Sequence, residues 1–348
     1  MVRSLTRRQN GLSAVANYLL KPFEYPGQLQ NGIFETPFHF LRDALMDRGI
    51  SLRTYDMGNL NDADKVLFFN HNDNVLEACL AEGLGRDSMV LFLYEPSVVF
   101  PRQYARRVWD NYGSVFTFKR ELVDGSNFIM MRYPQGQETL RRVPLYGERK
   151  LLTLINANKY SYVHGELYSL RRWAIRYFER NEPQIDLYGY GWDRNPFLSP
   201  GSKSLLLQAA KYRKIGRFVA DFVSNVRGFG SFKGTVAQKL DCLSNYRFCI
   251  CFENEAFDVG LTEKIFDCLF AGTVPIYFGA PSIRKYVPEM SFIDFGSFGN
   301  YVDLHEYLRQ MGSHEFLKMQ SAGQEFINSN EFESWKPESV FSEIAASL

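Results

Sequence analysis

The stretch CFENEAFDVGLTEKIFDCLFAGTVPIYFG, residues 251–279, joins two apolar runs through a loop that is rich in polar side chains. A purely structural connection between buried strands needs only a few turn residues. This loop and the turn after it instead contain Glu253, Asn254, Glu255, Asp258, Glu263 and Lys264. Polar groups gathered at the carboxyl end of a buried strand indicate a binding or catalytic site.

A short helix is predicted to begin after Thr262, because threonine is favoured at helix N-caps. Its buried face consists of Ile265, Phe266, Leu269 and Phe270. Lys264 then lies in the first turn, where the helix dipole is already positive and a cation is disfavoured. A bound anion would explain this lysine, since free N–H groups at a helix N-terminus bind phosphate. The alternative is a lysine that is simply solvated.

The rest of the chain predicts two α/β domains. Its 348 residues exceed the size of one ordinary hydrophobic core. Apolar runs that indicate buried parallel strands are 50–56, 65–70, 89–95, 114–118, 128–134, 150–159, 185–193, 247–253, 274–279 and 291–295. Helices are predicted among them at 32–49, 72–83 and 164–181. We predict two doubly wound, Rossmann-type domains that face a cleft, at 1–148 and 149–330, followed by a helical tail at 331–348.

Composition argues against several other classes of protein. The 40 basic and 39 acidic residues give a net charge of +1, so we expect no nucleic-acid partner. The five cysteines form no C-x-x-C pair and no zinc-like spacing, which favours a reducing compartment. The first 26 residues show neither a membrane span nor a signal-peptide pattern. We expect a soluble, cytoplasmic protein.

Residues 203–226 predict an amphipathic helix with a basic face. Its apolar residues at helical spacing are Leu205, Tyr212, Ile215, Val219, Phe222 and Val226. Its basic residues are Lys203, Lys211, Arg213, Lys214 and Arg217. Such a helix can lie on an anionic membrane, which would make the protein peripheral at the inner face of that membrane. The alternative is a helix whose apolar side packs on a domain and whose basic side is solvated.

The segments FEN (252–254) and TEK (262–264), followed by an apolar helix and AGTVPIYFG (271–279), resemble the signature of the α1,3/1,4-fucosyltransferases. Further similar segments are LTLINANK (152–159), IDLYGYG (185–191), GSFKGT (230–235), LSNYRFCICFEN (243–254) and YVPEMSFIDF (286–295). The resemblance is strong over about residues 150–296 and faint in the first half. It implies an inverting enzyme of bacterial type that uses GDP-fucose and has the two-domain GT-B architecture.

The resemblance also implies roles for individual residues. Lys264 and Lys233 would hold the diphosphate of the donor, Lys233 replacing a more usual arginine and losing its bidentate geometry. Glu263 would accept hydrogen bonds from hydroxyl groups of the donor, and Asn254 would orient the donor near its phosphates. Thr262 belongs to the same donor-binding motif.

Two further features bear on the donor. The chain has Gly260 where the family pattern has tyrosine, so another GDP-linked deoxyhexose is an alternative to fucose. The loop after the strand at 150–159 contains Asn156, Asn158 and Lys159, and Asn158 is a candidate contact to the donor base or phosphate. The alternative for this loop is ordinary polar chemistry before a helix. The nearby aromatic residues Tyr188, Tyr190 and Trp192 fit either stacking on the donor or domain packing.

An inverting transfer requires a base that removes the proton of the acceptor hydroxyl as it attacks. Glu95 directly follows an apolar strand, and the resemblance places a similar glutamate in the acceptor domain, so Glu95 is our candidate base. A loop carboxylate is the alternative, and His71 is a second candidate base. The D-x-D pair Asp62 and Asp64 precedes its strand and indicates a turn, so we expect no metal site and no required cofactor.

The expected partners are therefore a GDP-sugar donor and a glycan, a lipid-linked oligosaccharide or a glycosylated protein as acceptor. The expected chemistry uses Glu95 as general base while Lys264 and Lys233 stabilise the leaving diphosphate. A catalytically silent nucleotide-sugar-binding protein is the alternative from another class.

Overall fold

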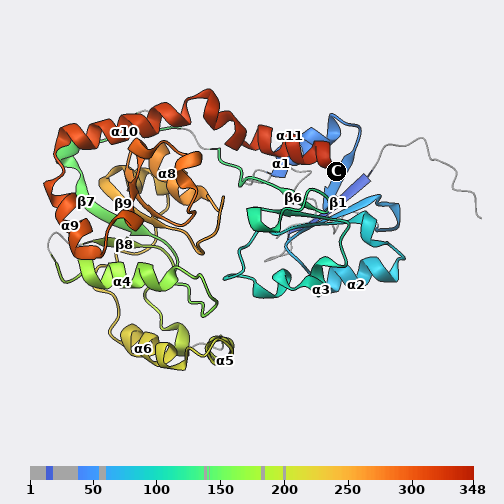
Figure 1. The fold of residues 1–348 in the computed structure, drawn as a ribbon, viewed down its shortest axis with the longest axis horizontal. Helices are drawn as coiled ribbons and strands as arrows, with labels where there is room; N and C mark the ends of the chain where they lie inside the picture. The colour runs from blue at the N-terminus through green and yellow to red at the C-terminus, as the bar shows by residue number, and fades with distance from the viewer. Residues whose placement is uncertain are drawn as a thin grey trace, which may run out of the picture. The chain divides into compact units, whose positions relative to one another are not determined.

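The computed structural model describes residues 13–18, 38–54, 60–136, 139–140, 142–181, 185–198 and 201–348. Most of the first 26 residues, for which the sequence predicts no signal peptide, lie outside the described residues. The described residues form two compact units, each built on a parallel sheet (Figure 1). Unit 1 contains the described residues up to Glu95, residues 102–134 and Trp335–Leu348, and unit 2 contains Pro96–Pro101 and 135–334.

Unit 1 has a six-stranded sheet with the order β2-β1-β3-β4-β5-β6. Its strands are β1 (Ser13–Tyr18), β2 (Ser51–Thr54), β3 (Lys65–Phe69), β4 (Met89–Phe92), β5 (Ser114–Thr117) and β6 (Phe128–Met130). Its helices are α1 (Phe38–Met46), α2 (Asp73–Ala81), α3 (Arg106–Trp109) and α11 (Pro337–Ser347). The rings of Phe69, Phe92 and Phe116 stack across β3, β4 and β5 with centroids 4.6 and 4.7 Å apart. These aromatic residues fix the register of the central strands.

The division of the chain differs from the predicted boundaries. The predicted tail at 331–348 is not separate, because most of it, from Trp335 onward, belongs to unit 1. Helix α11 buries Val340, Phe341 and Ile344, and the ring of Phe341 lies 5.9 Å from that of Phe38 on α1. The apolar face of α11 therefore completes the cover of the first sheet, a long-range contact that the local sequence pattern does not reveal.

Unit 2 has a five-stranded sheet with the order β11-β10-β9-β7-β8. Its strands are β7 (Lys150–Ile155), β8 (Asp186–Tyr188), β9 (Tyr246–Phe252), β10 (Val274–Phe278) and β11 (Ile293–Asp294). Its helices are α4 (Tyr168–Phe178), α5 (Ser202–Lys211), α6 (Ile215–Val226), α7 (Lys239–Ser244), α8 (Glu263–Phe270), α9 (Tyr301–Gln310) and α10 (Ser313–Ile327). The strand order reverses between β7 and β9, which makes their carboxyl ends the topological switch point of this sheet.

The prediction of a single helix at 203–226 is wrong, because the structure has two helices there, α5 and α6. Arg213 has a φ of 56°, a left-handed conformation that ends α5. The N–H of Lys214 donates to the carbonyl of Ala209 at 2.7 Å and that of Arg213 to Ala210 at 3.0 Å, which is a Schellman motif. Helix α6 then packs on the side of α4 away from the sheet (Figure 1), where Arg172 meets Asp221 at 3.6 Å.

Candidate functional site

The switch point of unit 2 brings together two polar loops. One follows β7 and contains Asn156 and Asn158, and the other follows β9 and runs from Glu253 to Thr262. Strands β7 and β9 are parallel neighbours, so both loops leave the same edge of the sheet. In open sheets of this topology, ligands bind outside the carboxyl ends of the strands at the switch point.

Glu253, Thr262 and Lys264 form one hydrogen-bonded cluster at this edge. The carboxylate of Glu253 accepts from the backbone N–H of Thr262 at 3.0 Å and from its hydroxyl at 2.8 Å. The ammonium of Lys264 lies 3.2 Å from Glu253 and donates to the Thr262 hydroxyl at 2.8 Å. The side chains of Lys264 and Glu253 are only 9% and 2% exposed. The first turn of α8 is thus held by a buried ion pair.

Glu263 is the second carboxylate beside Lys264. It lies 3.3 Å from the ammonium, and 41% of its side chain is exposed. Burial disfavours the charged form of Lys264, but Glu253 and Glu263 outweigh this effect and raise its pKa. Desolvation also disfavours the charged form of Glu263, which by itself would raise the pKa of this carboxyl group. The positive charges of Lys264 and Lys239 outweigh this effect and lower that pKa to about 2. Both groups are therefore charged at neutral pH.

Two further cations near this cluster are not among the residues that the sequence singled out. Arg171 of α4 is buried and donates to the carbonyl of Phe252 and, at 3.0 Å, to the side-chain oxygen of Asn254. Lys239, at the start of α7, lies 2.6 Å from Asp267 of α8. Burial opposes the charge on Lys239, but Asp267 and Glu263 raise its pKa. No local motif points to either residue, because each reaches the site from a distant helix.

Asn158 is held by the neighbouring loop after β8. Its amide donates to the carbonyl of Gly191 at 3.1 Å, and its side-chain oxygen is buried without a hydrogen-bond partner among the described residues. The two loops touch closely, because a Cβ on Gly189 would lie 2.1 Å from the carbonyl oxygen of Asn156. Trp192 is buried in the core and donates to that same carbonyl, whereas Tyr190 is 72% exposed. Trp192 is thus a packing residue, and Tyr190 has the exposed ring.

Lys233 lies elsewhere on unit 2. Its ammonium is 3.6 Å from Asp186 of β8, and 48% of its side chain is exposed. Its backbone N–H donates to the carbonyl of Leu187 at 2.8 Å. Among the described ion pairs, those of Lys264 involve Glu253 and Glu263. The structure therefore does not join Lys233 to the Lys264 cluster by a described contact.

The loop before α8 shows why glycine is found at position 260. A Cβ there would lie 2.5 Å from the ring of Phe257. An aromatic ring thus lies against Gly260, but it comes from a residue three positions earlier in the chain. Val259 has a φ of 65°, which is a strained conformation for a β-branched residue. Strain of this kind is concentrated at functional loops.

The backbone around Glu95 in unit 1 is tightly held. The side-chain oxygen of Asn70 accepts from the N–H of Glu95 at 2.8 Å. The carbonyl of Glu95 accepts from Gln103 at 2.8 Å and from the hydroxyl of Tyr104 at 3.0 Å. Asn70 itself has a φ of 69°, in the left-handed region. Asn70 and Gln103 therefore position the candidate base, and the sequence alone did not identify them.

The other candidate residues of unit 1, His71 as a base and Asp62 and Asp64 as metal ligands, lie in positions that indicate structural roles. His71 is buried, with its ring nitrogens 2.7 Å from the Tyr112 hydroxyl and 3.1 Å from Asp73, and burial lowers its pKa. Asp62 ends a short 3₁₀ turn that precedes β3, and Asp64 is exposed next to it. Neither aspartate belongs to a convergent group of metal-binding side chains among the described residues.

No helix in the described part of the chain combines the length and apolar character that a membrane crossing requires.

Comparisons with known proteins bear on this site. Residues 217–321 match the family described as glycosyltransferase family 10 (fucosyltransferase), C-terminal part. The α-(1,3)-fucosyltransferase FucT of Helicobacter pylori is 27% identical over 231 residues, which cover 62% of this chain and 48% of that protein. An α-(1,4)-fucosyltransferase of Arabidopsis thaliana is 41% identical over 70 residues, covering 20% of this chain and 18% of that protein. The chain thus spans about half or less of these relatives.

Solved structures show the same fold. An α1,3-fucosyltransferase crystallised with GDP superimposes with a TM-score of 0.56 at 15% identity, covering 99% of this chain and 92% of that chain. The fold of two Rossmann-like units is that of the GT-B glycosyltransferases. The family match includes β9, the Glu253–Lys264 cluster and α8. Residues 217–321 of this chain are therefore similar to the C-terminal part of glycosyltransferase family 10, the fucosyltransferases.

Proposed function

We propose that this chain is an inverting transferase that moves fucose from GDP-fucose to a hydroxyl group of a glycan. The acceptor oxygen attacks the anomeric carbon, the bond from that carbon to the diphosphate breaks, and GDP leaves. The acceptor proton passes to the carboxylate of Glu95. The family match over residues 217–321 and the α1,3- and α1,4-fucosyltransferase relatives support this reaction class.

The observation that carries the proposal is the buried Lys264 ammonium at the switch point of unit 2. It is oriented by Glu253 and Thr262 and lies in the first turn of α8, where helix amides also favour an anion. A charge that is fixed before the reaction stabilises a developing diphosphate without reorganisation. Asn254, which Arg171 holds, and Asn158 are proposed to orient the donor. Lys233 is proposed as a second cation that leaves Asp186 when the donor binds.

The test of the proposal is a transfer assay with GDP-fucose and a panel of acceptors. The panel contains free oligosaccharides, lipid-linked oligosaccharides and a glycosylated protein, and GDP release is measured with and without each acceptor. We expect acceptor-dependent GDP release that persists in excess EDTA, because fixed cations are proposed to replace a metal. Tight GDP binding without any transfer would instead support a silent nucleotide-sugar-binding protein.

The position of Gly260 bears on the identity of the donor sugar. Introducing the tyrosine of the family pattern, Gly260→Tyr, is expected to destabilise the protein by about 1–3 kcal/mol, since the new side chain must displace the Phe257 ring. The double variant Gly260→Tyr/Phe257→Ala removes the clash and should recover most of that stability. Thermal unfolding measures both, and kcat/KM for GDP-fucose against other GDP-deoxyhexoses shows which ring shapes the donor site. A stable single variant would contradict the clash.

The proposal includes peripheral contact with a membrane through residues 203–226. On α6, Ile215, Val219, Val223 and Val226 recur at helical spacing and are 43%, 53%, 49% and 65% exposed. The opposite side of α6 is held to unit 2, where Arg217 lies 2.6 Å from Glu166. This orientation is the reverse of the packing alternative, in which the apolar side faces inward. A helix in a soluble protein normally buries such a stripe.

Charge indicates which partner covers this stripe. Residues 201–228 contain six basic residues and one acid, Asp221, whereas the whole chain has a net charge of only +1. Lys203, Lys211, Arg213 and Arg227 are exposed. Basic residues beside an exposed apolar stripe fit an anionic lipid surface, where each contributes about 1 kcal/mol. We therefore propose an anionic bilayer, at the cytoplasmic face of a membrane, as the partner.

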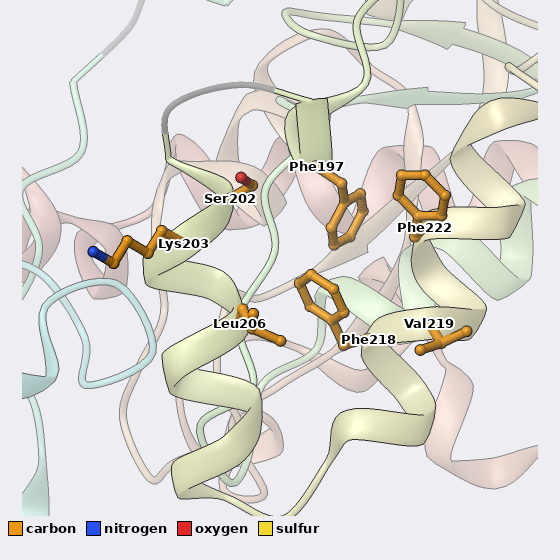
Figure 2. Close-up of a pocket in the computed structure, with 7 residues that line it drawn as sticks. All are labelled: Phe197, Ser202, Lys203, Leu206, Phe218, Val219 and Phe222. Atoms are coloured by element: carbon orange, nitrogen blue, oxygen red, sulfur yellow. The ribbon is translucent and has the colours of Figure 1, made fainter.

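A groove of about 450 Å³ between α5 and α6 adds apolar surface at the same place. Figure 2 shows Leu206 and the rings of Phe197, Phe218 and Phe222 turned into this groove, while Lys203 points away from it. Five of the seven residues that line the groove are apolar, which suits an acyl chain. Helices α5 and α6 thus offer lipid both the exposed apolar stripe of α6 and the groove between the two helices.

Vesicle flotation tests the contact. We expect the protein to float with vesicles that contain anionic lipid and not with neutral ones, and Val219→Asp/Val223→Asp to weaken binding at least tenfold. Val302→Asp is the matched control, because Val302 is a 59% exposed valine on α9. Binding that is unchanged in the double variant would overturn the proposal. A dimer that the double variant dissociates would also overturn it, because a second copy would then cover the stripe.

A further inference from the structure

Three of the five cysteines converge inside unit 2. Cys249 and Cys251 lie two residues apart on β9, so their side chains face the same side of the sheet, and Cys268 on α8 faces them. The sulfur atoms of Cys251 and Cys268 are 3.1 Å apart, and all three sulfurs lie within 4.8 Å of one another. The three residues are 4%, 2% and 1% exposed. The sequence prediction missed this cluster because it considered zinc-like spacings along the chain.

The thiol cluster lies beside a small cavity that two lysine residues help to line. A cavity of about 10 Å³ is lined by the three cysteines together with Asn156, Lys239 and Lys264. The sulfur of Cys251 also lies 3.4 Å from the carbonyl oxygen of Lys264. The ammonium groups of Lys239 and Lys264 are already paired with the carboxylates of Asp267 and Glu253, so a bound cation would be needed to offset the charge of buried thiolates.

We propose that Cys249, Cys251 and Cys268 bind one soft metal ion, and that Cu⁺ is the ion that this donor set fits best. Metal–thiolate bonds are about 2.3 Å long, so a trigonal site requires sulfurs about 4 Å apart. The three sulfurs lie within 4.8 Å of one another, and those of Cys251 and Cys268, now 3.1 Å apart, would separate by about 1 Å when the ion binds. Thiolates select Cu⁺, whereas Zn²⁺ requires a fourth ligand. The three thiols release their protons to solvent and copper remains Cu⁺. This binding does not depend on the proposed transfer reaction.

The chain supplies its own control for this proposal. Cys79 and Cys242 lie outside the cluster, so Cys79→Ala/Cys242→Ala should leave metal binding unchanged. Cys249→Ala, Cys251→Ala and Cys268→Ala should each weaken it by on the order of 100-fold, since even the loss of an outer-shell partner costs up to this much. The alanine variants are first compared with the natural protein by circular dichroism, to show that each is folded.

The measurement is an anaerobic titration of the reduced protein with Cu⁺ in competition with a Cu⁺-selective chelator. We expect one ion per chain, and X-ray absorption of the copper-loaded natural protein should show three sulfur neighbours, a result that needs no variant. Binding that is equally strong in Cys268→Ala, or absent from the natural protein, would overturn the proposal. So would a count of three free thiols in the freshly isolated, denatured protein, because two sulfurs would then form a disulfide.

Discussion

Replacing Lys264 with methionine is expected to lower kcat for fucose transfer by about 100- to 1,000-fold and to weaken GDP binding. The substitution removes the buried ammonium that is proposed to meet the charge developing on the diphosphate. Methionine keeps much of the length of the side chain, so the packing of α8 is largely preserved. Initial rates with GDP-fucose and titration with GDP measure the two effects separately.

The same substitution has a predictable effect on stability. It leaves the carboxylate of Glu253, which is 2% exposed, without its cation, and an unpaired buried charge costs about 3–5 kcal/mol. The double variant Lys264→Met/Glu253→Gln removes that charge and should regain much of the free energy of unfolding. It should not regain transfer, because the ammonium is still missing. Unfolding in urea and the transfer assay therefore separate the structural role of Lys264 from its proposed chemical role.

An exposed lysine of the same unit provides the control. Lys285 lies in a short 3₁₀ turn after β10 and is exposed, so Lys285→Met should change neither rate nor stability. If Lys264→Met retains full GDP affinity and transfer rate while losing stability, Lys264 does not contact the diphosphate. In that case the buried ion pair serves the fold alone.

Glu95→Gln is expected to reduce transfer by about 100- to 10,000-fold while GDP binding stays unchanged. Glutamine has the same shape but does not take up the acceptor proton. The backbone at this position is held by Asn70, Gln103 and Tyr104 through contacts to its N–H and carbonyl, which the substitution leaves intact. Loss of rate without loss of GDP affinity or stability is the signature of a missing base.

Two further variants sharpen this experiment. Glu77→Gln replaces an exposed glutamate of α2 in the same unit and should be silent. Asn70→Gly tolerates the positive φ of that position but removes the oxygen that accepts from the N–H of Glu95, so it should lower kcat more than it changes KM for the donor. A full rate in Glu95→Gln would refute the assignment of the base and direct attention to another group of unit 1.

The local sequence was enough to predict the framework of the site. The apolar runs at 247–253 and 274–279 correspond to β9 and β10, and the predicted helix after Thr262 is α8. Strand and helix signals of this kind depend on residues that are close in the chain, so they survive in the fold. The polar loop at 253–262 lies at the switch point for the same reason, since the alternation of strands and helices already indicates a doubly wound sheet.

Only the tertiary structure decided which charged groups meet. Arg171 and Lys239 reach the β9–α8 region from α4 and α7, which no motif connects to it, and Lys233 is paired with Asp186 instead of lying against Lys264. The packing of α8 on β9 likewise brings Cys268 to Cys249 and Cys251. The predicted helix at 203–226 breaks at Arg213 and turns its apolar stripe outward. The physical reason is the same in each case. A residue type and its spacing determine local conformation, whereas burial and charge pairing depend on neighbours that only the packing of distant segments supplies.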